Sequence, residues 1–247
     1  MAPWLRSAGL VGGSTLLFGA LRWGLGRCPL PAHVRREAIR TWRWRNLLVS
    51  FAHSVVAGIW AVAGVWQNPD VFSDIINISP PSGPLLLAFS SGYFIHDSLD
   101  IIVCRQSRAS WEYLVHHLMA VTGLFSGILL NRFVGAGLLV LFVEVSNIFL
   151  TIRMMIRLGN LQFPTVYKVN KYVNLVAYFV FRLAPQAYLS WYFARYVEVR
   201  GQGAFLMVNL VLLDTMILMY FSRLLRSDFC PGTRQQGPDS EKKFLID

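Results

Sequence analysis

Charged residues and cysteines are both scarce in this 247-residue chain. Only 15% of its residues are charged, whereas soluble domains usually carry about 25%. The three cysteines, Cys28, Cys104 and Cys230, lack the spacing of a metal site and do not form the pattern of a disulfide scaffold. Acidic residues are fewer than basic ones, 13 against 23. This composition argues against an ordinary soluble domain and against a cysteine-based framework.

Long apolar runs are what the chain has in abundance. Hydrophobic residues make up 55% of it, and its mean hydropathy is +0.47. A membrane span needs roughly 17–25 mostly apolar residues, and the runs that approach this length cover 7–21, 46–66, 85–103, 110–130, 133–155, 173–193 and 204–221. The sequence therefore predicts an all-α integral membrane protein with about seven transmembrane helices. Because the first run is short and follows Arg6, a cleaved signal peptide is its alternative interpretation.

The basic residues lie between the runs and predict an orientation. The side with the first, third and fifth connections and the C-terminal tail holds 18 Lys and Arg, and the other side holds 4. This bias places the N-terminus outside and the C-terminus in the cytosol, and it favours an uncleaved first span. It also accounts for the net charge of +10 without a nucleic-acid partner. Asn77, in the sequon Asn77-Ile78-Ser79, then falls in an outer loop as a glycosylation candidate.

Polar side chains stand inside six of the seven runs. Counted from the cytosolic edge at 1.5 Å per residue, most of them share a layer about 10–13 Å deep. The layer comprises His53, His96, Asp97, Asp100, His116, His117, Glu144, Asn147, Arg182 and Asp214. Ionisable groups in hydrocarbon cost at least ~2.5–3.5 kcal/mol each, so they face a bundle interior or a watered cavity. We expect a polar pocket reached from the cytosol, with a purely structural hydrogen-bonded cluster as the alternative.

His116 and His117 are adjacent, which restricts what they do together. Neighbouring residues on a helix point ~100° apart, so the pair cannot hold one metal ion as histidines at i and i+4 do. The five histidines of the chain do not form the boxes of a di-iron enzyme. We expect no metal and no cofactor. One imidazole should face the pocket, as a general base or a donor to a carbonyl, while the other packs against a neighbouring helix.

Three stretches resemble the TLC-domain family of multi-pass membrane proteins, which includes the ceramide synthases. They are "GYFIHDSLD" at 92–100, the apolar span that contains the histidine pair, and "FVEVSNIFLTIR" at 142–153. The resemblance implies a six-helix TLC bundle around a lipid or acyl-chain tunnel over residues 40–230. Residues 1–39 would then be one additional N-terminal span with a basic cytosolic linker. The polar residues 231–247 are expected to form a disordered cytosolic tail.

The resemblance also assigns roles to the candidate residues. Ceramide synthases transfer an acyl chain from acyl-CoA to a sphingoid amine with a histidine pair and a later acidic motif. His116 and His117 match the pair, Glu144 stands at the first acidic position, and Asn147 stands at the second. Because Asn cannot ionise, this substitution argues against ceramide-synthase chemistry. The resemblance implies instead control of phospholipid composition, limiting polyunsaturated chains and favouring a more rigid membrane.

Three functions remain open from the sequence. The first is a regulator of membrane lipid composition that binds an acyl chain or phospholipid in the bundle. The second is an acyl-CoA-dependent acyltransferase, and the third is an accessory subunit of another membrane protein such as a channel. No retention signal is visible, which favours the plasma membrane over the endoplasmic reticulum as the alternative. Cys230, just after the last run, is a candidate for palmitoylation.

Overall fold

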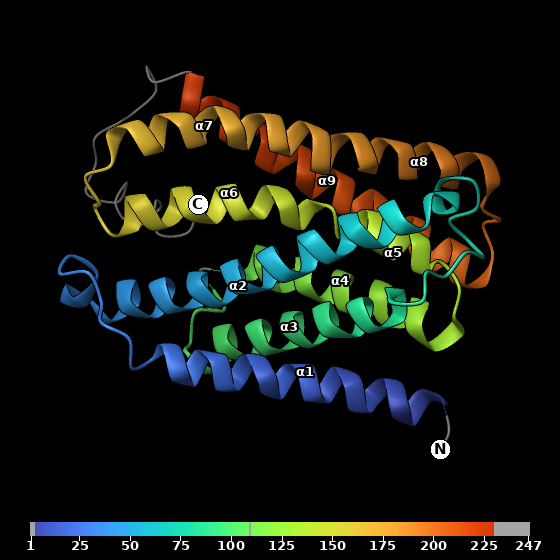
Figure 1. Cartoon of the computed structure of the whole chain (residues 1–247), viewed down its shortest axis with the longest axis horizontal. Helices are drawn as coiled ribbons and strands as arrows, with labels where there is room; N and C mark the ends of the chain where they lie inside the picture. The colour runs from blue at the N-terminus through green and yellow to red at the C-terminus, as the bar shows by residue number, and fades with distance from the viewer. Residues whose placement is uncertain (1–2, 109, 230–247) are drawn as a thin grey trace.

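Every regular element in the described part of the chain is helical. The computed structural model describes residues 3–108 and 110–229. Its long helices lie side by side along the long axis of the molecule, and their connections gather at the two ends (Figure 1). We call the end with the connections 26–37, 104–110 and 159–163 the basic end, and the other the opposite end.

Five helical stretches are long and apolar enough to cross a membrane. They are α2 (Ala38–Gln67), α3 (Gly83–Val103), α4 (Trp111–Leu130), the combined stretch Val134–Leu158, and α9 (Gly201–Phe229). The prediction of an all-α multi-pass membrane protein is therefore confirmed. The count of seven spans stays a prediction, because the helices at the first and sixth runs are not among these five.

The first and sixth runs nevertheless form helices of spanning length. The first run lies in α1 (Pro3–Leu25). The sixth lies in a continuous rod of α7 (Pro164–Tyr178), a π-helical turn (Phe179–Leu183) and α8 (Ala184–Tyr196). Pro185 lacks the N–H that would bond to the carbonyl four residues earlier, so the backbone just before it widens into the π turn. The rod begins at Pro164, before the start of the apolar run at 173, and therefore extends beyond this run toward the basic end.

The fifth run is not one straight helix as the sequence predicts. It divides into α5 (Val134–Val140) and α6 (Val143–Leu158). Between them the backbone hydrogen bonds connect residues three apart instead of four, as in a 3₁₀ helix. The N–H of Glu144, for example, donates to the carbonyl of Leu141 at 3.0 Å. The segment before α5 is constrained too, since Phe133 has a φ of 62° and its N–H donates to the carbonyl of Ile76 at 2.7 Å. The break turns the short α5 into the middle of the bundle.

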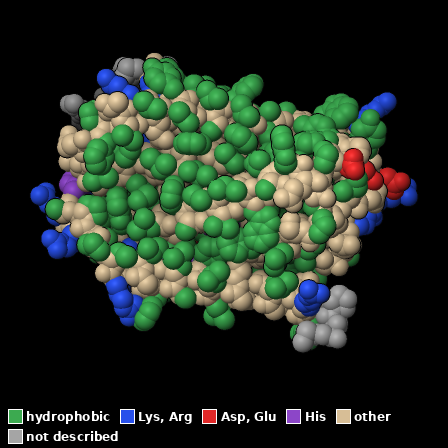
Figure 2. Space-filling view, in the orientation of Figure 1, with side chains coloured by type: hydrophobic (Ala, Val, Ile, Leu, Met, Phe, Trp, Pro, Cys, Tyr) green, Lys and Arg blue, Asp and Glu red, His purple; other side chains and the backbone are tan. Residues whose placement is uncertain are grey.

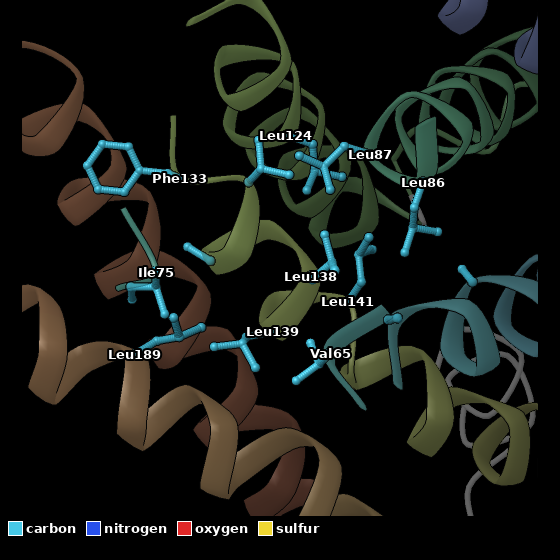
Figure 3. Close-up of a cluster of buried hydrophobic side chains, with 14 of the residues drawn as sticks. Val65, Ile75, Leu86, Leu87, Leu124, Phe133, Leu138, Leu139, Leu141 and Leu189 are labelled. Carbon is cyan, nitrogen blue, oxygen red and sulfur yellow. The ribbon is translucent and has the colours of Figure 1, made fainter. Parts of the chain in front are cut away.

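The hydrophobic core surrounds α5 at the opposite end of the molecule. Figure 3 shows Leu138 and Leu139 of α5 among side chains from α3, α8 and the 68–82 connection. That connection, which includes the 3₁₀ helix Pro69–Phe72, buries Ile75 fully against the core. Gly135 lets it approach, because a Cβ at this position would lie 2.9 Å from Val71.

The remaining helices assemble around this core by close contacts. α2 packs along α6, α3 packs between α1 and α4, and α9 contacts α4 and α8. α1 lies at the edge of the bundle against α3 (Figure 1). Small residues allow the two backbones to approach: a Cβ on Gly92 would clash with the Ser14 side chain, and the Ser14 hydroxyl donates to the carbonyl of Phe89 at 2.7 Å.

The surface is divided in a way that suits a bilayer. Figure 2 shows hydrophobic side chains across the middle of the molecule, with Lys and Arg gathered at both ends and Asp and Glu visible at the opposite end. The exposed apolar side chains of α4 and α9 include Leu118, Val208 and Leu218, each at least 60% exposed. Lipid chains would cover such side chains in a membrane. Which end faces the cytosol stays a prediction from the charge count.

The orientation predicts which thiols can be labelled. Cys28 is exposed at the basic end, and Ser73 is exposed in the 68–82 connection at the opposite end. Two versions are made, one whose only thiol is Cys28 and one whose only thiol comes from Ser73→Cys. In sealed microsomes, whose outer face is the cytosolic one, a membrane-impermeant maleimide should label Cys28 directly. It should label Ser73→Cys only after detergent is added. The reverse pattern would place the N-terminus in the cytosol.

Candidate functional site

A cavity lies between α3, α4, α5, α6, α8 and α9. The empty space between its lining residues is about 860 Å³, counting the part that is open to the outside. Most of its lining is apolar, including Phe94, Met119, Ala120, Leu124, Phe133, Leu141, Leu189, Phe193, Leu206 and Leu213. The polar side chains in the lining are His116, Glu144, Gln186 and Asn209. Such a site suits an apolar chain that carries a single polar group.

The cavity extends along the helices and not across them. Its lining on α9 runs from Leu206 to Ile217, which corresponds to about 16 Å at a 1.5 Å rise per residue. That is close to half of the ~30 Å hydrocarbon core of a bilayer, the thickness of one leaflet. Phe133 and Phe193, at the end farther from the basic end, contact each other with ring centroids 5.6 Å apart. His116 and Glu144 line the part nearer the basic end.

The two adjacent histidines have different surroundings. His116 lines the cavity. His117 is buried and points to α3, where its Nδ1 lies 3.5 Å from Asp97 Oδ2 and its ring lies 5.2 Å from that of Phe94. The ~100° between neighbouring helix positions separates the two imidazoles. Only His116 is therefore placed to contact a ligand in the cavity.

Asp97 and Asp100 join three helices near the basic end. Asn46 of α2 donates to Asp97 Oδ1 at 2.5 Å, and the Trp42 indole N–H donates to Asp100 Oδ2 at 2.9 Å. Arg22 of α1 forms an ion pair with the same Asp100 carboxylate at 3.5 Å. These contacts satisfy both carboxylates between helices, so neither is directed into the cavity. Together they hold α1, α2 and α3 in register.

Glu144 is the centre of a second network. Its side chain is 2% exposed, and Oε2 accepts hydrogen bonds from the Ser54 hydroxyl at 2.6 Å and from Asn147 Nδ2 at 3.0 Å. His53 Nδ1 lies 3.6 Å from the same oxygen, while His53 Nε2 lies 3.1 Å from the Ser90 hydroxyl. Such partners are what allow a carboxylate to be buried away from water. The network binds α6 to α2 and α3.

Asn147 connects Glu144 to a buried cation. Its Nδ2 donates to Glu144, and its Oδ1 accepts a hydrogen bond from the Arg182 guanidinium. Arg182 also donates through Nε to the Ser146 hydroxyl at 3.1 Å. An amide can donate to a carboxylate and accept from a guanidinium at once, whereas a carboxylate at this position could only accept. The asparagine at the second acidic position therefore fits this bridge better than an aspartate would.

The predicted polar layer differs from the observed arrangement. Of the predicted residues, only His116 and Glu144 line the cavity. Asp214 accepts a hydrogen bond from the Ser190 hydroxyl at 2.5 Å, and half-buried His96 lies on the α1 side of α3. The residues outside the lining of this cavity are His53, His96, Asp97, Asp100, His117, Asn147, Arg182 and Asp214. The reason is physical: polar groups in an apolar bundle gain most by pairing with each other in the seams between helices.

Several polar residues in or near the site were not identified from the sequence. Asn46 lies seven positions before His53, a spacing that shares a helix face, so periodicity on α2 could have found it. Gln186 lies four positions after Arg182 and could have been found in the same way. Arg153 pairs with Asp228 through both carboxylate oxygens, with Nη1 at 2.6 Å from Oδ2. No sequence signal indicated that partnership, because the two residues are far apart in the chain.

The other sequence candidates lie away from the cavity. Among the described residues, no three His, Cys, Asp or Glu side chains gather to hold a metal ion. Asn77 is exposed, and its side chain donates to Asp74 Oδ2 at 2.9 Å. That hydrogen bond lowers the pKa of the Asp74 carboxyl below its ordinary value. Glycosylation of Asn77 stays a prediction, and Cys230 and the 231–247 tail lie outside the described residues.

Comparison with known proteins identifies relatives for the whole chain. Residues 43–226 match a family model described as the TLC domain. TLC domain-containing protein 1 of Gallus gallus is 64% identical over 252 aligned residues, covering 100% of both chains. The human protein of the same name is 63% identical over 219 residues, with 89% of each chain covered. TLC domain-containing protein 2 of Danio rerio is 33% identical over 242 residues, with 97% of each covered.

Replacing the bridging amide should destabilise the bundle. Asn147→Leu leaves the Arg182 guanidinium and the Glu144 carboxylate each without one hydrogen-bond partner in a buried place. We expect a loss of about 2–3 kcal/mol of unfolding free energy, or a fall of roughly 5–10 °C in the Tm of the detergent-solubilised chain. Thr215→Val is the control, because this exposed hydroxyl bonds only to its own helix at Val211. Equal Tm values for the two variants would contradict the bridge.

Proposed function

The chain belongs to the TLC-domain family, and on that premise we propose that it regulates the acyl-chain composition of membrane phospholipids. The proposed effect is to limit the incorporation of polyunsaturated chains and so to favour a more rigid membrane. A role connected with membrane lipids accords with the family and with the multi-pass helical architecture. We place its action at the plasma membrane, with the endoplasmic reticulum as the alternative.

The observation that carries this proposal is the cavity. It is about as long as one leaflet is thick, its lining is mostly apolar, and its polar side chains are few. An acyl chain or one chain of a phospholipid is the membrane component that matches these properties. In the most apolar stretch of α4, and likewise of α9, 22% of the residues are buried inside the protein. In the other three candidate spans this share is 44–56%. Such sparsely covered helices favour entry of a lipid from the bilayer side.

Filling the cavity tests the proposal without removing a polar group. Ala120 lines the cavity, whereas Leu118 on the same helix is 65% exposed on the outer surface. Null cells supplied with a polyunsaturated fatty acid are rescued with wild type, Ala120→Phe or the control Leu118→Phe. Wild type and Leu118→Phe should lower polyunsaturated phospholipid measured by mass spectrometry, and Ala120→Phe should not, because its ring occupies the chain's place. If wild type leaves the lipid profile unchanged, the proposed function is wrong.

Acyl transfer is a second candidate, because His116 and Glu144 line the same cavity. In that reaction the imidazole would take a proton from an amine or hydroxyl acceptor as the acceptor attacks the acyl carbonyl of acyl-CoA, and would return it to the CoA sulfur as the thioester C–S bond breaks. The contacts of Asn147 argue against acyl transfer. This residue stands at the second acidic position, where it supplies no carboxylate and instead bridges Glu144 and Arg182.

A direct assay separates the two candidates. The purified chain is incubated with radiolabelled oleoyl-CoA and with either lysophosphatidylcholine or sphinganine as acceptor. If transfer takes place, His116→Ala should reduce it by about 10²–10⁴-fold, the usual contribution of a general base. Leu118→Ala should leave it unchanged. Wild-type protein that transfers no label to either acceptor, in a preparation that binds oleoyl chains, would exclude the enzyme.

A further inference from the structure

Gln186 presents an unused hydrogen-bond donor to the cavity. Its side chain is 4% exposed and belongs to the lining, and its amide nitrogen Nε2 is buried without a hydrogen-bond partner among the described residues. The other two buried polar side chains of the lining have partners. Glu144 accepts from Ser54, and Asn209 Nδ2 donates to the carbonyl of Phe205 in its own helix at 3.5 Å. Among the buried polar side chains of the described lining, the Gln186 amide is therefore the one whose N–H lacks an acceptor; the other polar lining side chain, His116, is only half-buried.

The π turn sets where this amide lies. Arg182, at the end of the turn, bonds to Ser146 and Asn147 of the antiparallel α6. Gln186 follows one helical turn later and so shares that face of the rod. Because the helices run in opposite directions, it falls level with the residues one turn before Asn147, where Glu144 stands. Gln186, Glu144 and His116 thus form a polar end to a cavity whose remaining lining side chains are apolar except for Asn209.

The chemistry of this end selects the kind of ligand atom. A buried N–H without an acceptor is unfavourable, so a ligand that supplies an acceptor there gains affinity. An acyl lipid carries such an acceptor, its carbonyl oxygen, directly at the head of the apolar chain. The described lining contains no Lys or Arg that could pair with a free carboxylate, and the nearby Arg182 is already engaged by Ser146 and Asn147, so a buried carboxylate would be unfavourable there. The polar end therefore suits a neutral ester, thioester or amide.

We propose that Gln186 donates a hydrogen bond to the neutral acyl carbonyl of the lipid whose chain fills the cavity, and so determines how deep that chain enters. This rests on the proposed function of the cavity as an acyl-chain site. It adds the residue that recognises the ligand and the class of group that is recognised. The chain beyond the carbonyl then lies along the apolar lining toward Phe133 and Phe193.

A matched pair of ligands tests the assignment. The detergent-solubilised full chain is titrated with tritiated methyl oleate and with tritiated cis-9-octadecene, which has the same kind of chain but no carbonyl. Wild type should bind the ester about tenfold more tightly, a factor that corresponds to about 1.4 kcal/mol. Gln186→Met, similar in length but apolar, should lose this preference and still bind the hydrocarbon. The control Thr215→Val should keep the preference, because this exposed hydroxyl lies outside the cavity lining and bonds only to Val211 of its own helix.

Two further readouts complete the experiment. Competition of bound methyl oleate by dioleoylphosphatidylcholine or by oleoyl-CoA distinguishes a phospholipid ester from a thioester as the source of the carbonyl. The Tm of ligand-free Gln186→Met should equal or exceed that of wild type, since a buried unpaired donor has been removed. A Tm several degrees lower would mean that Gln186 holds the bundle together, and it would overturn the assignment.

The outcomes also distinguish a failure of this inference from a failure of the proposed function on which it rests. If Gln186→Met keeps the tenfold preference, or if wild type has none, the inference is wrong, while the cavity remains an acyl-chain site because both ligands bind. If neither ligand binds to wild type, the proposed function fails and the inference fails with it.

Discussion

Buried polar groups in a mostly apolar bundle must find their partners within the protein, and this constraint organises the rest of the structure. The interior offers no bulk water to solvate a carboxylate or a guanidinium. Glu144 and Arg182 are therefore connected through Asn147, and Asp97 and Asp100 are connected to side chains of α1 and α2. The Glu144 network joins α6 to the distant α2 and α3, and the Asp97 and Asp100 network joins the consecutive α1, α2 and α3. The polar residues thus determine which helices are neighbours, while apolar packing fills the space between them.

Two local irregularities of the backbone then create the cavity. The break between α5 and α6 directs α5 into the bundle, where Leu138 and Leu139 pack in the core. The π turn before Pro185 directs Arg182 to α6 and Gln186 to the cavity. Both lie in segments that an apolar run alone would predict to be regular helices. π turns are found at functional sites more often than elsewhere, and here one lies next to the polar end of the cavity.

The asparagine at the second acidic position acquires a physical meaning in this context. By sequence alone, Asn147 only removes a carboxylate from a motif. In the structure its amide donates to Glu144 and accepts from Arg182, which a carboxylate could not do. The same geometry ties Glu144 firmly into the structure. A site that binds and orients a lipid chain agrees with such fixed groups better than one that moves protons, and the accessible His116 is the group that keeps the second possibility open.

The sequence by itself determined the all-α membrane architecture, because runs of apolar residues long enough to cross a bilayer leave few alternatives to helices. Among the described residues it also identified most of the buried ionisable side chains, namely His53, Asp97, His117, Glu144 and Arg182, since such groups are rare in apolar runs and conspicuous there. It missed most of the buried hydroxyls and amides. Only the tertiary structure decided how they pair, because partners such as Arg153 and Asp228 are brought together by helix packing and not by spacing along the chain. Likewise, whether His116 or His117 faces the cavity depends on the rotation of α4 about its axis. That rotation is set by the neighbours of the helix, and one chain's local pattern does not encode it.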